Sequence, residues 1–126
     1  MNRRTLFAAL VLLAAPFTAT AHGPAPAAAH GGTIAETSND YWVELVVRGD
    51  QFVAYVTDPD FKPVPSAQLG GKATVLAGGK REEVTLVAGD GNALKGKLAA
   101  PAAGKMTAVL ALTIGGKPAT VRFAMG

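Results

Sequence analysis

Two histidines are the residues in this chain whose chemistry stands out. His22 and His30 are the only histidines among 126 residues, and there is no cysteine. Cleavage after Ala21 would leave His22 as the first residue, and its free amine and imidazole Nδ1 together can chelate Cu(II), which favours nitrogen ligands. We therefore take His22 and His30 as candidate ligands for copper or another divalent transition metal. The alternative is that cleavage falls beside a histidine by chance.

Two methionines could add soft thioether ligands. Met106 and Met125 fall on the expected core faces of neighbouring strands, where methionine usually fills space. The alternative is a copper site near a strand end that combines thioether and imidazole ligands.

Three further residues are candidates for interactions. Asp58 and Asp60 flank Pro59, and such a pair could do acid–base chemistry or bind Ca²⁺ weakly. The alternative is turn chemistry, because aspartate caps its own backbone in turns. Trp42 opens an expected strand and would be an interaction residue on the outer face, unless the leader or the opposite sheet covers it.

The sequence lacks the usual signs of catalysis. Nucleophilic catalysis needs a base beside the nucleophile, and both histidines precede the expected folded body. There is no G-x-S-x-G motif, and the Gly-Gly pairs lie between strands rather than before a helix, so they do not predict a phosphate loop. We expect a protein that is not an enzyme and binds no organic cofactor.

The N-terminus predicts export. Arg3 and Arg4 precede an apolar run, Leu6 to Phe17, which is followed by an A-x-A site, and these are the three parts of a secretory signal peptide. The run is shorter than the roughly 20 residues of a membrane span. We expect a helical signal peptide at 1–21, a flexible Ala/Pro/Gly/His leader at 22–32, and a periplasmic mature protein without a membrane span. The arginine pair leaves both general and twin-arginine export open.

The charge balance gives no support for a nucleic-acid partner. Removing residues 1–21 removes two arginines and no acidic residue, so the formal charge falls from +3 to +1. Lys80 and Arg81 are followed at once by Glu82 and Glu83, which indicates a solvated turn rather than a basic patch. We expect no nucleic-acid binding.

The remainder of the chain, 33–126, predicts one all-β domain. Apolar residues alternate with polar ones over short segments, and Gly-Gly or Gly-Asp pairs separate several of them, which favours hairpins. Seven or eight short strands of this kind favour a β-sandwich, with a closed barrel as the alternative. The clearest segments lie at 41–48, 52–57, 72–77, 81–88, 93–98, 105–114 and 119–125.

Several short motifs resemble a known family. His30-Gly31-Gly32, the run Trp42 to Val47, the run Ala54 to Asp58, and Lys62-Pro63-Val64-Pro65 are similar to a small periplasmic domain of heavy-metal efflux adaptor proteins. The last motif, followed by Ala73-Thr74-Val75, also resembles immunoglobulin-like and transthyretin-like sandwiches.

The likeness spans residues 30–126 and implies a periplasmic β-sandwich connected with metal resistance, with an efflux component or other envelope protein as partner. Of the metal ligands of that family, the resemblance assigns only one to a position in this sequence, His30. The alternative is a structural or protein-interaction domain of the cell envelope with no metal role.

Overall fold

The computed structural model describes residues 24–126. The predicted signal peptide at 1–21 and the candidate ligand His22 lie outside the described residues. The described part is built from strands and one short 3-10 helix, so the all-β prediction is confirmed. It contains no helix long and apolar enough to cross a membrane.

Residues 24–126 contain eight strands, at the upper end of the seven or eight expected. Their turns form where the sequence has glycine: Gly78-Gly79 and Gly115-Gly116 all have positive φ, as the tightest hairpin turns require. The elements are β1 (Thr33–Glu36), β2 (Trp42–Arg48), β3 (Gln51–Thr57), η1 (Ser66–Gln68), β4 (Leu69–Ala77), β5 (Lys80–Ala88), β6 (Ala93–Lys97), β7 (Met106–Ile114) and β8 (Lys117–Met125).

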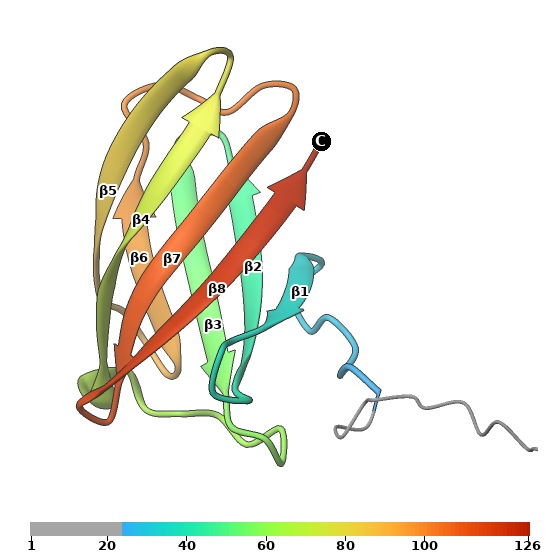
Figure 1. Ribbon diagram of the computed structural model, residues 1–126, viewed down its shortest axis with the longest axis vertical. Coiled ribbons are helices and arrows are strands. Elements are labelled where there is room, and N and C mark those ends of the chain that lie inside the picture. The colour runs from blue at the N-terminus through green and yellow to red at the C-terminus, as the bar shows by residue number, and fades with distance from the viewer. Residues whose placement is uncertain (1–23) are drawn as a thin grey trace, which may run out of the picture.

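The strands form one antiparallel sheet in the order β1-β2-β3-β6-β5-β4-β7-β8. The sheet curls on itself, so that β4, β7 and β8 pack across β6, β3 and β2 (Figure 1). Only two residue pairs, Val87 with Lys95 and Ala88 with Leu94, join β5 to β6. The fold is therefore a nearly closed, barrel-like sheet with two packed layers, which lies closer to the expected alternative than to two separate sheets.

The two ends of the sheet meet at the turn between β1 and β2. The N–H of Ser38 donates to the carbonyl of Thr120 at 2.9 Å, and the N–H of Thr120 donates to Ser38 Oγ at 3.1 Å. No ladder joins β1 to β8 among the described strands. These two hydrogen bonds fix β1, and with it the segment that precedes β1, beside the end of the sheet.

The interior is filled by the alternating apolar residues. Val43 and Leu45 point inward from β2, while Trp42 and Glu44 lie on its other face, as the period of two predicts. The largest fully buried side chains come from both layers: Phe52, Phe123, Leu45, Leu94, Leu110, Val43 and Val56. Because this packing fills the inside of the sheet, a polar site near β2 has to lie on the outer face.

Candidate functional site

Glu44 is the centre of the candidate site. It lies on the outer face of β2, opposite Ile34 of β1 and Tyr55 of β3. An outward-facing glutamate is usually solvated, but the side chain of Glu44 is only 6% exposed. A buried carboxylate needs hydrogen-bond donors to offset its lost hydration, and the preceding segment supplies them.

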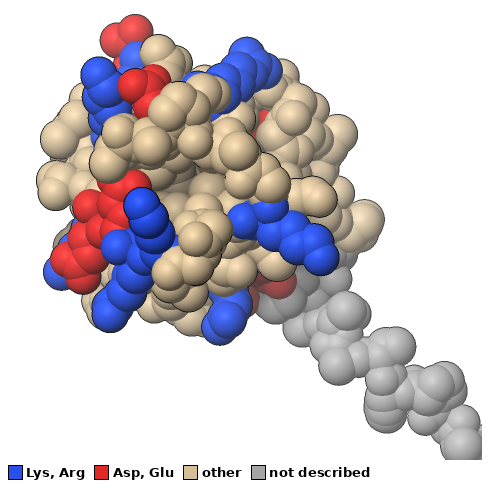
Figure 2. All heavy atoms as spheres, turned by 90° about the horizontal axis from the view of Figure 1, so that it is seen from above, with Lys and Arg blue, Asp and Glu red and all other residues tan. Residues whose placement is uncertain are grey.

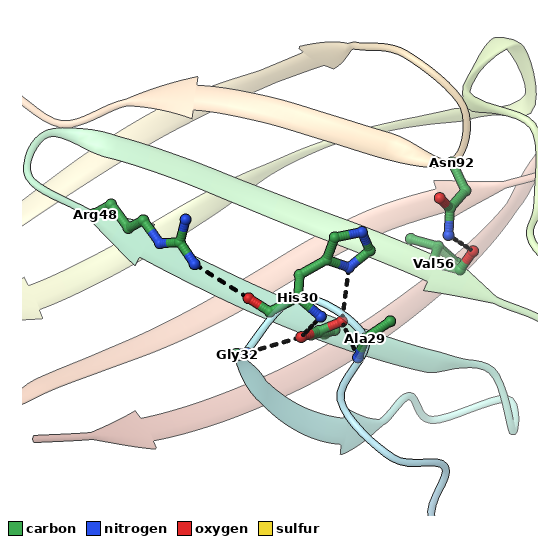
Figure 3. Close-up of polar contacts among 7 residues, drawn as sticks. Ala29, His30, Gly32, Arg48, Val56 and Asn92 are labelled. Atoms are coloured by element: carbon green, nitrogen blue, oxygen red, sulfur yellow. Dashed lines mark hydrogen bonds and ion pairs between the residues drawn. The ribbon is translucent and has the colours of Figure 1, made fainter.

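Backbone N–H groups of the leader surround this carboxylate (Figure 3). Ala29 N donates to Oε1 at 3.1 Å, and the N–H groups of His30 and Gly32 donate to Oε2 at 2.8 and 2.7 Å. Gly32 has to be small, because a Cβ there would lie 2.5 Å from the carbonyl oxygen of Leu45. Within the predicted flexible leader, the segment 29–32 is thus anchored to β2.

The His30 side chain completes the set of donors. Its Nδ1 lies 3.0 Å from Glu44 Oε1, and its ring stacks on Tyr55 with 3.6 Å between ring centroids and an interplanar angle of 4°. Arg48 also donates to the carbonyl of His30 at 3.2 Å. Since an ionised carboxylate can only accept, Nδ1 carries the proton. Nε2 then lies on the far side of a ring that is 43% exposed.

The hydrogen bonds also determine the charge of Glu44. Burial raises the pKa of the carboxyl, but the His30 side chain and the backbone N–H groups of Gly32, His30 and Ala29 outweigh it, so the pKa lies below the ordinary value of 4.5. Glu44 is therefore an anion at neutral pH. This anion holds the imidazole in one tautomer and one orientation.

A cavity of about 340 Å³ lies beside this pair, on the outer face of β2 and β3. His30, Glu44 and Tyr55 form part of its wall. The leader closes one side with Pro26, and the β5–β6 turn adds Asn92, whose amide donates to the carbonyl of Val56 at 2.8 Å (Figure 3). With Ile34 of β1 and with Phe61 and Pro63 of the loop after β3, the cavity is assembled from six parts of the chain.

Trp42 lines the same cavity, which bears on its predicted role as an exposed contact residue. The side chain is on the outer face, as expected, but only 9% of the residue is exposed. Phe61 packs edge-on against it, with 6.3 Å between ring centroids and an interplanar angle of 66°. Trp42 can therefore contact a ligand inside the cavity more readily than a flat partner surface.

Asp58 and Asp60 lie in the loop that carries Phe61. Asp58 Oδ1 accepts from the N–H groups of Asp60 at 2.8 Å and Lys62 at 2.9 Å. This is the turn arrangement weighed as the alternative for the pair. The loop holds Phe61 at a φ of 66°, a conformation that non-glycine residues rarely adopt.

The structure separates the methionines from the histidine site. Met106 and Met125 are register partners on β7 and β8, as their expected faces indicated, and both line a different cavity at the end of the sheet where β4 turns into β5. Met106 is buried, at 5% exposure. His30 is on the outer face of the other layer, so the methionines and His30 do not share a site.

The space-filling view shows no continuous basic patch at that end of the sheet. Lysine and arginine side chains are spread around an uncharged centre, with acidic side chains among them (Figure 2). Lys97 approaches Asp50 there, with 3.7 Å between Nζ and Oδ2.

His30 and Trp42 were predicted from the sequence, but Glu44 and Tyr55, which hold the His30 ring, were not. One signal was present: Glu44 is the only acidic residue in the apolar run of β2. Over residues 24–126 there is no group of three or more His, Cys, Asp or Glu side chains that could hold a metal ion.

Comparisons with protein-family models, with curated proteins and with solved structures find no match to this chain.

Proposed function

We propose that this protein is an exported, non-catalytic periplasmic module that binds a transition-metal ion, copper or another divalent cation, through Nε2 of His30. The observation that carries the proposal is the Glu44–His30 pair, with 3.0 Å between Oε1 and Nδ1. Metal-binding histidines almost always donate their other ring N–H to a carboxylate, a carbonyl or water, which fixes the tautomer and raises the basicity of the ligand. His30 has this arrangement, with Glu44 as the carboxylate.

The second ligand in this proposal is His22. It precedes His30 by eight positions, and eight residues can span up to about 28 Å when extended. Such a segment is long enough to return an N-terminal amine and imidazole to the face that bears Nε2 of His30. Nitrogen ligands of this kind suit Cu(II) and Zn(II).

The proposed location and partner follow from the remaining sequence features. Residues 1–21 have the three parts of a cleaved signal peptide. The resemblance of the short motifs to efflux adaptor domains suggests an efflux component as partner. Metal delivery to such a partner would need exchangeable binding, which a site with few ligands favours.

Metal titration of matched variants tests this proposal. His30→Asn is the sharpest change, because the amide nitrogen of asparagine can replace Nδ1 as donor to Glu44 while Nε2 is lost. Glu44→Gln tests the orienting role, and loss of such a partner typically weakens metal binding by about 10–100-fold. Glu83→Gln removes the same charge from an exposed position on β5 and is the control.

Calorimetric titration with Cu(II) and with Zn(II) should show the tightest binding for the wild type and Glu83→Gln. We expect weaker binding for Glu44→Gln and for His30→Asn, and loss of the site in the His22→Ala/His30→Ala double variant. Equal, weak binding by the wild type and the double variant would contradict a metal role.

An interaction domain without a metal role is the second candidate, and the aromatic cavity favours it. Phe61 is 47% exposed beside Trp42, and aromatic residues are enriched where proteins contact their partners. In this case the Glu44–His30 pair serves only to attach the leader. Pull-down from envelope extracts with wild type and Phe61→Ala, in the presence of a chelator, would separate a metal-independent partner from a metal-dependent one.

A further inference from the structure

The cavity on the outer face of β2 and β3 has a chemistry that a metal role does not use. Three aromatic side chains line it: Trp42, Tyr55 and Phe61. They come from two adjacent strands and one loop, so the sheet and the loop together bring them to one place. A volume of about 340 Å³ is at the small end of the usual range for ligand sites.

The charge at this cavity is negative. Glu44 forms part of the wall as a buried anion, 6% exposed. Both of its oxygens already accept two hydrogen bonds each, so they have little capacity for a donor from a ligand. Glu44 therefore contributes its field rather than a direct contact, and a field of this sign favours a cation.

The polar groups of the wall include acceptors for a cationic ligand. The amide nitrogen of Asn92 donates to the carbonyl of Val56, and the side-chain oxygen of Asn92 is an acceptor. The other surfaces are those of the aromatic rings, apart from the face of Tyr55 that the His30 ring covers. Ring faces attract cations that have lost their water, and they hold alkylated ammonium groups especially well.

The Phe61 loop fixes one of these rings at the rim of the cavity. Phe61 has a φ of 66°, which is strained for a residue with a side chain. The strain is maintained by Asp58, whose Oδ1 accepts from two N–H groups and whose carbonyl accepts from Phe61 N at 2.9 Å. Strain held in this way is concentrated at ligand sites, and here it keeps a half-exposed ring at the rim of the cavity beside Trp42.

We propose that this cavity binds a small organic cation, of the alkylated ammonium class, between the rings of Trp42, Tyr55 and Phe61 and in the field of Glu44. The proposal goes beyond a metal role, because the ligand coordinates no metal and its binding does not need Nε2 of His30. It can therefore be correct even where the metal proposal fails.

Trp42 makes the test direct, since it is the only tryptophan in the chain and its fluorescence reports on this cavity. The metal-free protein, in the presence of a chelator, is titrated with choline and separately with the neutral isostere of choline, in which a quaternary carbon replaces the nitrogen. We expect a saturable change in fluorescence with choline, and binding of the isostere weaker by about tenfold or more. Equal binding of the two, or no saturable change with choline, would overturn the proposal.

Variants locate the site. Phe61→Gly removes the ring and relieves the positive φ, so we expect a folded protein that has lost the choline response. Leu76→Ala is the matched control, because Leu76 has the same 47% exposure as Phe61 but lies at the other cavity, and it should bind choline like the wild type. A full choline response in folded Phe61→Gly would also overturn the proposal, and the comparison of choline with its isostere stands whether or not that variant folds.

Discussion

Replacing Glu44 by glutamine should release the leader from the sheet while leaving the rest of the fold intact. The carboxylate accepts four hydrogen bonds, two at each oxygen. Glutamine keeps the shape of the side chain but presents an NH₂ group in place of one oxygen. The two hydrogen bonds to that oxygen are lost, because the NH₂ group then faces N–H donors. A hydrogen bond to a charged group contributes about 1.5–3 kcal/mol. Because His30 is partly exposed, we use the lower figure, which gives about 3 kcal/mol for the two bonds.

Hydrogen exchange measured by NMR tests this magnitude at the affected groups. A loss of about 3 kcal/mol corresponds to exchange on the order of a hundredfold faster at the amides of Ala29, His30 and Gly32. Core amides such as that of Leu110 should keep their rates, and Glu83→Gln should leave all rates unchanged. Unchanged exchange at the three leader amides in Glu44→Gln would refute the conclusion that this carboxylate holds the leader.

Three further predictions concern pH, backbone geometry and packing. The pKa of Glu44 is below its ordinary value of 4.5, so ionised Glu44 stabilises the docked leader above that pH. This stabilisation is lost as the pH falls through the lowered pKa. Protection factors of the leader amides should therefore fall below about pH 4.5 in the wild type but not in Glu44→Gln. Gly71 has a φ of 148°, and a Cβ there would collide with the backbone of β7, whereas a Cβ at Gly70 would meet open space. In urea unfolding, Gly71→Ala should therefore lower the free energy of unfolding by about 2 kcal/mol or more. Gly70→Ala should lower it much less. Leu110 is fully buried and Leu76 is 47% exposed, so Leu110→Ala should lower the free energy of unfolding by about 2–5 kcal/mol and Leu76→Ala by less than about 0.5 kcal/mol.

Much of the fold could be predicted from local pattern. Alternation in the run from Val43 to Val47 and the glycine pairs at 78–79 and 115–116 determine strands and hairpins, and the structure places them as expected. The closure of the sheet could not be predicted in this way. It depends on Ser38 meeting Thr120, 82 positions later, and on two residue pairs between β5 and β6, and neither contact leaves a periodic signal.

The candidate site was only half predictable for a related reason. Composition predicted that the leader would be flexible, because Ala, Pro and Gly bury little apolar surface. The leader is instead attached mainly through its backbone N–H groups, which every non-proline residue carries and which composition cannot reveal. The acceptor, Glu44, is 12 to 15 positions away, and its one local signal, a single acidic residue in an apolar run, does not indicate which groups it binds.

The same attachment explains why Trp42 is less exposed than a contact residue on a free outer face would be. The leader segment that Glu44 holds also lines the cavity next to Trp42, together with Phe61. Phe61 was not selected from the sequence, since a single aromatic between Asp60 and Lys62 has no periodic partner. Its position depends on the backbone turn around Asp58, which is a consequence of four hydrogen bonds.

The most direct test of the metal proposal is to observe the two nitrogens of the His30 ring while Zn(II) is added. In protein labelled with ¹⁵N at histidine, the pair with Glu44 predicts that Nδ1 carries a proton before any metal is added. We expect Zn(II) to shift the Nε2 resonance while Nδ1 keeps its proton, and we expect Glu44→Gln to weaken this response. Coordination through Nδ1, or no change at either nitrogen in the presence of excess Zn(II), would contradict the proposal that Glu44 prepares His30 for a metal ion.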